Sequence, residues 1–120
     1  MDRVMSRTSY GMIMASVKFV RKLANRLEGD RLSVWVKEKD VTEHYGPEVG
    51  FVRATIALRQ LTRMPFRFES GGQYRNRPLI LLVDCNMEKR TMQVFFSKES
   101  RDMLQEVTRS WRLRMVLGGG

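Results

Sequence analysis

Two short apolar runs near residue 90 place the tightest limit on how this chain folds. They read PLILLVD (78–84) and RTMQVFF (90–96), with a few polar residues around NMEK between them. In the second run Met92, Val94 and Phe96 fall on one face of an extended chain, the period of a strand with one side buried. The sequence therefore predicts an antiparallel hairpin with a tight polar turn.

A helix is predicted directly after this hairpin. Ser97 offers a hydroxyl to the free amides of a helix start, and Glu99 lies in the first turn, where the helix dipole favours negative charge. The apolar residues that follow recur at helical spacing, namely Met103, Leu104, Val107 and Trp111. We expect a helix from about Lys98 to Arg112, with Trp111 anchoring its far end against the sheet.

The N-terminal part of the chain predicts one helix and one strand. Apolar residues at helical spacing indicate a helix from about 9 to 27, and Gly29 supplies its stop. Leu32, Val34 and Val36 then alternate with other residues in a strand. The chain is thus predicted to be one α+β domain over 1–120 with the order α-β-β-β-α, a small antiparallel sheet and both helices on one face. The other sheet face would be open, and 118–120 would be an unstructured tail.

Residues 38–77 form a long basic connection between the first and second predicted strands. Glycine and proline mark a loop over 40–50. The run 51–63 fits a helical and a strand pattern equally well, and we favour a strand because Gly50 is a poor helix cap. The run ESGGQYRNR (69–77) predicts a flexible loop. The connection leaves room for an extra strand or helix.

Charge points to a polyanionic partner. The chain has a formal net charge of +9 at pH 7, and sixteen of its 22 basic residues are arginines. Arginine's planar fork chelates phosphate and stacks on bases, which favours nucleic acid over an anionic membrane surface. The alternative is a charge that serves only solubility.

The basic connection carries the strongest local signal. Its arginines are interleaved with Phe66, Phe68 and Tyr74, and its later part, from 51 to 77, contains one acid, Glu69. Arginines with aromatics suit phosphate contact combined with base stacking. The alternative is a solvated face over core aromatics. The arginines concerned are Arg53, Arg59, Arg63, Arg67, Arg75 and Arg77.

Catalysis is not supported by the composition. His44, the only histidine, lies in the Gly/Pro loop, where a histidine is most often solvated, and Cys85 is the only cysteine. We therefore expect no zinc cluster and no Cys–His pair of suitable context. Glu38, Asp40 and Glu43 are typical of a solvated turn. We therefore predict a non-catalytic protein with no metal site and no cofactor. The single cysteine and the absence of a long apolar run indicate a reducing, cytoplasmic location without membrane insertion.

Three stretches resemble the family of the 14-kilodalton subunit of the signal recognition particle, from its Alu domain. They are MASVKFVRKLANRLEGDRLSVWVKEKD, PLILLVDCNMEKRT and VFFSKESRDMLQEVTRSWRLRM, in the family's order. The resemblance implies an α-β-β-β-α fold that pairs with the related 9-kilodalton subunit or with a second copy. It also implies binding of the particle's Alu RNA and a part in elongation arrest during protein targeting, with only indirect contact to the ribosome.

The resemblance also implies where the RNA binds. The family's basic loop corresponds here to 39–77, including Arg53, Arg59, Arg63, Arg75 and Arg77, and its hairpin turn to Lys89 and Arg90. Together with Lys37, Lys39 and Arg67, these are the predicted RNA-binding residues. Leu82 departs from the pattern, because relatives tend to carry an arginine there.

Trp35 and Phe95 lie on the predicted open sheet face, which suggests a dimer interface. Two alternatives stay open: a generic binder of double- or single-stranded RNA, and a protein-interaction module that uses the open face.

Overall fold

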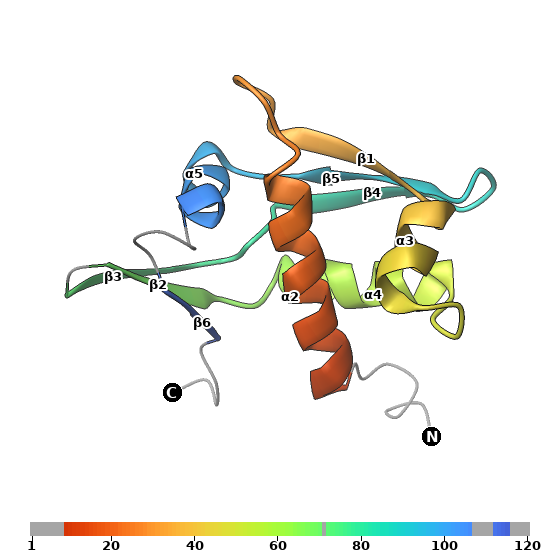
Figure 1. Ribbon diagram of the computed structural model, residues 1–120, viewed down its shortest axis with the longest axis horizontal. Helices are drawn as coiled ribbons and strands as arrows, with labels where there is room; N and C mark the ends of the chain where they lie inside the picture. Colours follow the sequence, from red (N-terminus) through yellow and green to blue (C-terminus); the bar gives the residue numbers. More distant parts are fainter. Residues whose placement is uncertain (1–8, 71, 107–111, 116–120) are drawn as a thin grey trace.

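Four helices and two three-stranded antiparallel sheets make up the described part of this computed structural model, residues 9–70, 72–106 and 112–115 (Figure 1). The helices are α2 (Tyr10–Ala24), α3 (Glu38–Tyr45), α4 (Phe51–Leu61) and α5 (Lys98–Glu106). The strands are β1 (Ser33–Lys37), β2 (Phe66–Ser70), β3 (Gln73–Arg77), β4 (Leu82–Asn86), β5 (Thr91–Phe95) and β6 (Arg112–Met115). The predicted α+β class is confirmed. None of the described helices combines the length and the apolar character that a membrane span requires.

The central sheet contains the three strands that the sequence predicts, in the order β1-β5-β4. Both pairs are antiparallel, with Val36 opposite Met92 and Met92 opposite Cys85. The β4–β5 hairpin closes through Arg90, whose φ of 53° lies in the left-handed region. Beyond β5, Ser97 Oγ accepts a hydrogen bond from the Ser100 backbone N–H at 3.0 Å. The predicted hairpin and the predicted cap of α5 are therefore both confirmed.

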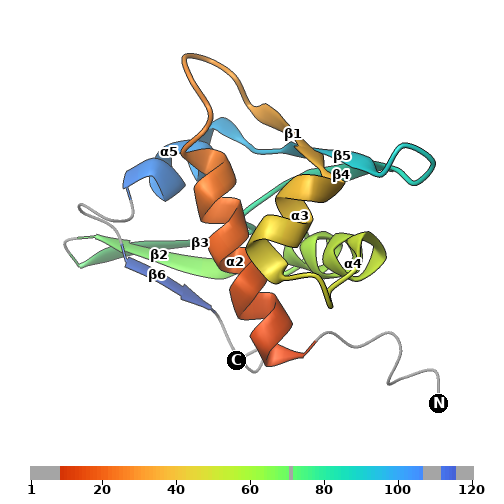
Figure 2. The same cartoon turned by 45° about the vertical axis from the view of Figure 1, so that its right-hand side comes forward.

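The core lies on one side of the central sheet. Val36, Met92 and Val94 point into it and are buried, and Figures 1 and 2 show α2 and α4 on this side of the sheet. Ser9 Oγ caps α2 by accepting the Met12 N–H at 3.1 Å. The buried stripe of α2 consists of Ile13, Ser16, Val17, Phe19, Val20, Leu23 and Ala24.

The expectation of a strand over 51–63 is wrong, because these residues form helix α4. Its buried residues recur every three or four positions, as a helix packed on one side requires: Phe51, Ala54, Thr55, Ala57, Leu58 and Leu61. Val52 and Ile56, which the strand pattern needs on the same face as Leu58, are instead 46% and 40% exposed. Packing against α2 and β4 decides between two patterns that the sequence leaves equal.

The flexible loop expected over 69–77 is also wrong. β2 and β3 form a hairpin in which Phe66 lies opposite Arg77, and Gly72 takes the positive φ of 83° that the turn needs. Phe66 and Phe68 alternate into the core and are fully buried. β6 pairs with the other side of β2, so the small sheet has the order β3-β2-β6.

Two further boundaries differ from the expectation. The loop predicted over 40–50 begins only after Tyr45, because α3 buries Val41 and Asp40 accepts the Lys37 backbone N–H at 2.9 Å. Arg112, expected as the last residue of the closing helix, belongs to strand β6. The proposed anchor Trp111 and the tail 118–120 lie outside the described residues.

Candidate nucleic-acid interface

The central sheet has one face that no described helix covers. The register places three cross-strand rows on it, one of which runs from Trp35 through Gln93 to Asp84. Trp35 is 61% exposed and Leu82 is 54% exposed, while Phe95 is half-buried. We call this the open face, and it comprises Ser33, Trp35, Lys37, Leu82, Asp84, Asn86, Thr91, Gln93 and Phe95.

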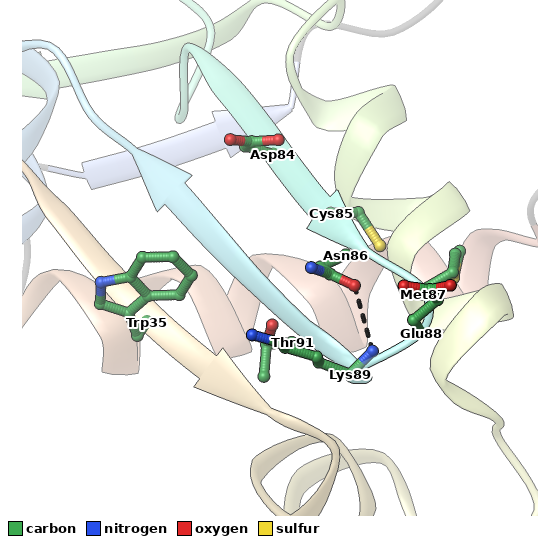
Figure 3. Close-up of a pocket in the computed structure, with 8 residues that line it drawn as sticks. All are labelled: Trp35, Asp84, Cys85, Asn86, Met87, Glu88, Lys89 and Thr91. Atoms are coloured by element: carbon green, nitrogen blue, oxygen red, sulfur yellow. Dashed lines mark hydrogen bonds between the residues drawn. The ribbon is translucent and has the colours of Figure 1, made fainter.

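A hollow of about 510 Å³ lies on the open face at the turn end of the β4–β5 hairpin (Figure 3). One of its polar groups is held in place by the hairpin itself, since Asn86 Oδ1 accepts the Lys89 backbone N–H at 3.1 Å. In Figure 3 the Trp35 ring lies across the hollow from Asn86. We call it the hairpin pocket, and it is lined by Trp35, Asp84, Cys85, Asn86, Met87, Glu88, Lys89 and Thr91.

Cationic side chains gather at the same end of the sheet. Lys37 ends β1 and lies in register with Thr91, and Lys89 and Arg90 belong to the adjacent hairpin turn. Arg90 Nη1 lies 3.7 Å from Glu38 Oε2. Lys37, Lys89 and the exposed Lys39 form no ion pair with any described residue. Their charge is therefore available to a ligand.

A second cationic group flanks the β4 edge of the sheet. Arg53 and Arg59 on α4 and Arg63 just after its C-terminal end are exposed and form no ion pair among the described residues. Arg59 Nη2 donates to the Val83 carbonyl at 3.4 Å, and this hydrogen bond holds the guanidinium against the edge strand β4. A hollow of about 390 Å³ joins this group to the end of the open face, lined by Arg59, Thr62, Arg63, Leu81, Leu82 and Val83.

The remaining predicted arginines lie on the small sheet and divide into two kinds. Arg75 Nη1 pairs with Glu99 Oε2, and Arg77 Nη2 lies 2.6 Å from Glu99 Oε1, so both fasten β3 to α5. Arg67 instead stacks on the ring of Tyr74, with its guanidinium carbon 4.4 Å from the ring centroid. The sequence pattern grouped these three with the α4 arginines, whereas the structure holds them in contacts of their own.

His44 lies in a structural contact, not in the solvated loop that the sequence suggests. Its Nε2–H donates to the Ala15 carbonyl at 2.8 Å, and its Nδ1 accepts from Lys22 Nζ at 3.0 Å. The ring is therefore neutral, because a lysine can only donate. Burial lowers the pKa of His44 from its ordinary value of 6.5, and the nearby charges of Lys22 and Lys18 lower it further, against the opposing Ala15 bond.

Two other potentially reactive side chains, Cys85 and Tyr45, each lie against a hydroxyl group. Cys85 Sγ lies 3.9 Å from Thr55 Oγ1 on the core side of β4. Burial raises the pKa of Tyr45 to about 12, against the opposing hydrogen bond of its hydroxyl with Ser16 Oγ at 2.7 Å. Within the part of the chain that the structure describes, no three histidine, cysteine or acidic side chains converge to hold a metal ion.

Sequence reasoning missed two kinds of residue. Asp84 and Asn86 share the hairpin pocket, and the only signal for them was their spacing of two and four residues after Leu82 on one strand. Arg101 is buried and donates from Nη1 to the carbonyls of Gly29 at 2.7 Å and Arg31 at 3.2 Å. Nothing in the sequence distinguished it from the exposed arginines.

Fold and site together define a small α+β protein with an open, partly aromatic sheet face between two groups of unpaired cations. No protein-family model, curated protein or solved structure matches this chain.

Proposed function

We propose that the protein is a non-catalytic RNA-binding protein that holds unpaired nucleotides on its open face. The observation that carries this proposal is that the exposed Trp35 shares the open face with the unpaired cations of the hairpin end, while Arg59 and Arg63 flank the opposite edge of the sheet. Aromatic side chains on an open sheet, flanked by cations that follow the backbone, are the typical means of binding single-stranded RNA.

The dimensions suit a short segment of RNA. Five-residue strands give the open face a length of about 17 Å along the strands and roughly 10 Å across them. Trp35 supplies a stacking surface in the middle row of the face, on its edge strand β1. Lys37 and Lys89 contact phosphates at the turn end, and Arg59 and Arg63 contact phosphates beyond Leu82 at the β4 edge.

The resemblance to the signal recognition particle family suggests the particular RNA. We propose the Alu portion of the particle's RNA as the ligand, in the cytoplasm, with the 9-kilodalton subunit or a second copy as partner and elongation arrest as the biological role. The order of α2, β1, β4, β5 and α5 supports this proposal, since it is the order the family has. Competition between Alu-type RNA and a plain duplex of equal length tests it, and equal competition would leave only general RNA binding.

The RNA-binding proposal predicts a defined effect of charge reversal at the C-terminal end of α4. Arg59→Glu with Arg63→Glu should weaken binding of a labelled single-stranded RNA at least tenfold, measured by fluorescence anisotropy. The slope of log affinity against log salt should fall in magnitude by about 1.4, since each phosphate contact contributes roughly 0.7 on a single strand. The Arg63 side chain has no partner among the described residues and that of Arg59 makes one hydrogen bond, at 3.4 Å, to a carbonyl, so the fold should be retained.

A matched control carries the same charge change away from the open face. Lys18→Glu with Arg31→Glu alters two exposed cations, one on α2 and one before β1. We expect this variant to keep most of the affinity and the salt slope. Equal losses in both variants would mean that binding follows net charge alone, and an unchanged affinity in the α4 variant would contradict the proposed site.

A second candidate is pairing with another protein through the same face. Leu81 and Leu82 are 58% and 54% exposed beside the half-buried Phe95, and Trp35 lies diagonally across the sheet from Phe95. A contiguous exposed apolar surface is typical of an interaction site. This candidate keeps Trp35 and Phe95 as dimer contacts and places the RNA on the α4 arginines alone.

A further inference from the structure

The hairpin pocket contains a carboxylate that a phosphate-binding surface does not explain. Asp84 is exposed on the open face and forms no hydrogen bond or ion pair with any described residue. On a chain of net charge +9 it repels the phosphates that the surrounding cations attract. Its place in one pocket with Trp35 suits a ligand group that donates hydrogen bonds.

The neighbouring groups have fixed roles. The register puts Trp35 and Asp84 in one row on either side of Gln93, and Gln93 Nε2 is engaged with Ser33 Oγ at 3.0 Å. Asn86 uses its Oδ1 to accept the Lys89 backbone N–H, which leaves the amide nitrogen as its free donor. Figure 3 shows that nitrogen on the side of Asn86 that faces Trp35. Besides the side chains of Glu88, Lys89 and Thr91 near the turn, the pocket thus offers an aromatic face, the two acceptor oxygens of Asp84 and the amide donor of Asn86.

We propose that the hairpin pocket selects a guanine base from the bound RNA. This inference rests on the proposed RNA-binding function and adds the identity of one base. Guanine stacks on Trp35, its N1–H and N2–H₂ donate to the Asp84 carboxylate, and its O6 accepts from Asn86 Nδ2. Unpaired bases are commonly read in this way, by stacking together with hydrogen bonds to the Watson–Crick edge.

Each of the other bases leaves a conflict at Asp84. Adenine and cytosine present one donor group beside a ring nitrogen that is an acceptor, so a carboxylate oxygen would face a lone pair. Uracil presents one N–H between two carbonyl oxygens. Guanine alone has two adjacent donors, and unpaired or mismatched polar groups in a site are costly.

The test uses the full chain and labelled uridine hexamers that carry one central guanosine, inosine or adenosine. The guanosine oligomer should bind about tenfold more tightly than all-uridine RNA, the discrimination typical of a bidentate contact. Inosine lacks the N2 amino group and should lose most of this gain. Asp84→Asn should abolish the preference, so that the guanosine oligomer binds no more tightly than all-uridine RNA. Free GMP, which shares the base without the strand, should compete only weakly.

The matched control is Asp30→Asn, which removes one exposed carboxylate outside the pocket and should retain the guanine preference. Salt-dependent binding of all oligomers with equal affinity would overturn the guanine inference and leave the RNA-binding proposal standing. Absence of binding to any oligomer at low salt would overturn both. Strong competition by free GMP would identify a mononucleotide site and overturn the placement of the base within a strand.

Discussion

Arg101 provides a test of how helix α5 is held to the turn before β1. Its side chain on α5 is only 8% exposed, and it links the turn before β1 to α5 through the carbonyls of Gly29 and Arg31. Its Nε and Nη2 also donate to Asp102 Oδ1 at 3.0 and 2.9 Å. Replacement by methionine keeps most of the apolar volume and removes every one of these hydrogen bonds.

The expected loss follows from the partners. Hydrogen bonds from a charged donor contribute about 1.5–3 kcal/mol each, so the two bonds to carbonyls amount to roughly 4 kcal/mol. The bonds to Asp102 add little, since that carboxylate is 45% exposed and regains water. Methionine avoids the cost of burying a guanidinium, and water reaches the exposed turn, which together offset about half of the loss. We therefore expect Arg101→Met to lower the free energy of unfolding by about 2 kcal/mol.

Thermal unfolding followed by circular dichroism measures this effect. A loss of about 2 kcal/mol corresponds to a fall in Tm of about 8 °C for a domain of this size. Arg31→Met is the matched control, because only the backbone carbonyl of Arg31 takes part in the contact and its side chain is exposed. That variant should stay within about 0.5 kcal/mol of the parent protein. If Arg101→Met unfolds at the same temperature as Arg31→Met, the buried arginine does not hold α5 to the turn.

Two further predictions concern acidity and self-association. Because the folded pKa of His44 lies below its ordinary value of 6.5, the unfolded chain binds more protons between these two pKa values. The free energy of unfolding should therefore fall as the pH drops below about 6.5 towards the folded pKa, and it should stay constant above pH 6.5. His44→Gln should remove this slope in urea titrations at several pH values. If the open face pairs with a second copy, sedimentation should detect a dimer at micromolar concentration that Trp35→Glu dissociates, and a monomer at all concentrations would contradict self-pairing.

The β4–β5 hairpin and the start of α5 could be predicted because their determinants are local. Met92 and Val94 alternate within one strand, and Ser97 lies next to the amide that it caps. Helix α4 was ambiguous because Ala54 and Leu58 belong to both a helical and a strand pattern. Only contact with α2 and β4 resolves the choice.

Strand β3 and the pocket needed information from other parts of the chain. Residues 73–76 of β3 are all exposed, so the strand has no apolar alternation, and its identity comes from backbone pairing with β2. Trp35 and Phe95 were assigned to the open face correctly from alternation alone. Asp84 and Asn86 were not noticed, since their place in the hairpin pocket depends on the register that puts Trp35 and Thr91 in the same cross-strand rows.

The insertion of α3, α4, β2 and β3 between β1 and β4 has a consequence for the order of folding. β4 and β5 are joined by a short turn, whereas the bond from Gln93 Nε2 to Ser33 Oγ joins β5 to β1 across 60 residues. Closing the longer loop costs more chain entropy, and contacts between distant residues form late. We therefore expect the hairpin to form first and β1 to dock after the inserted elements have collapsed. Trp35 travels with β1, so the open face would be completed in the last step of folding.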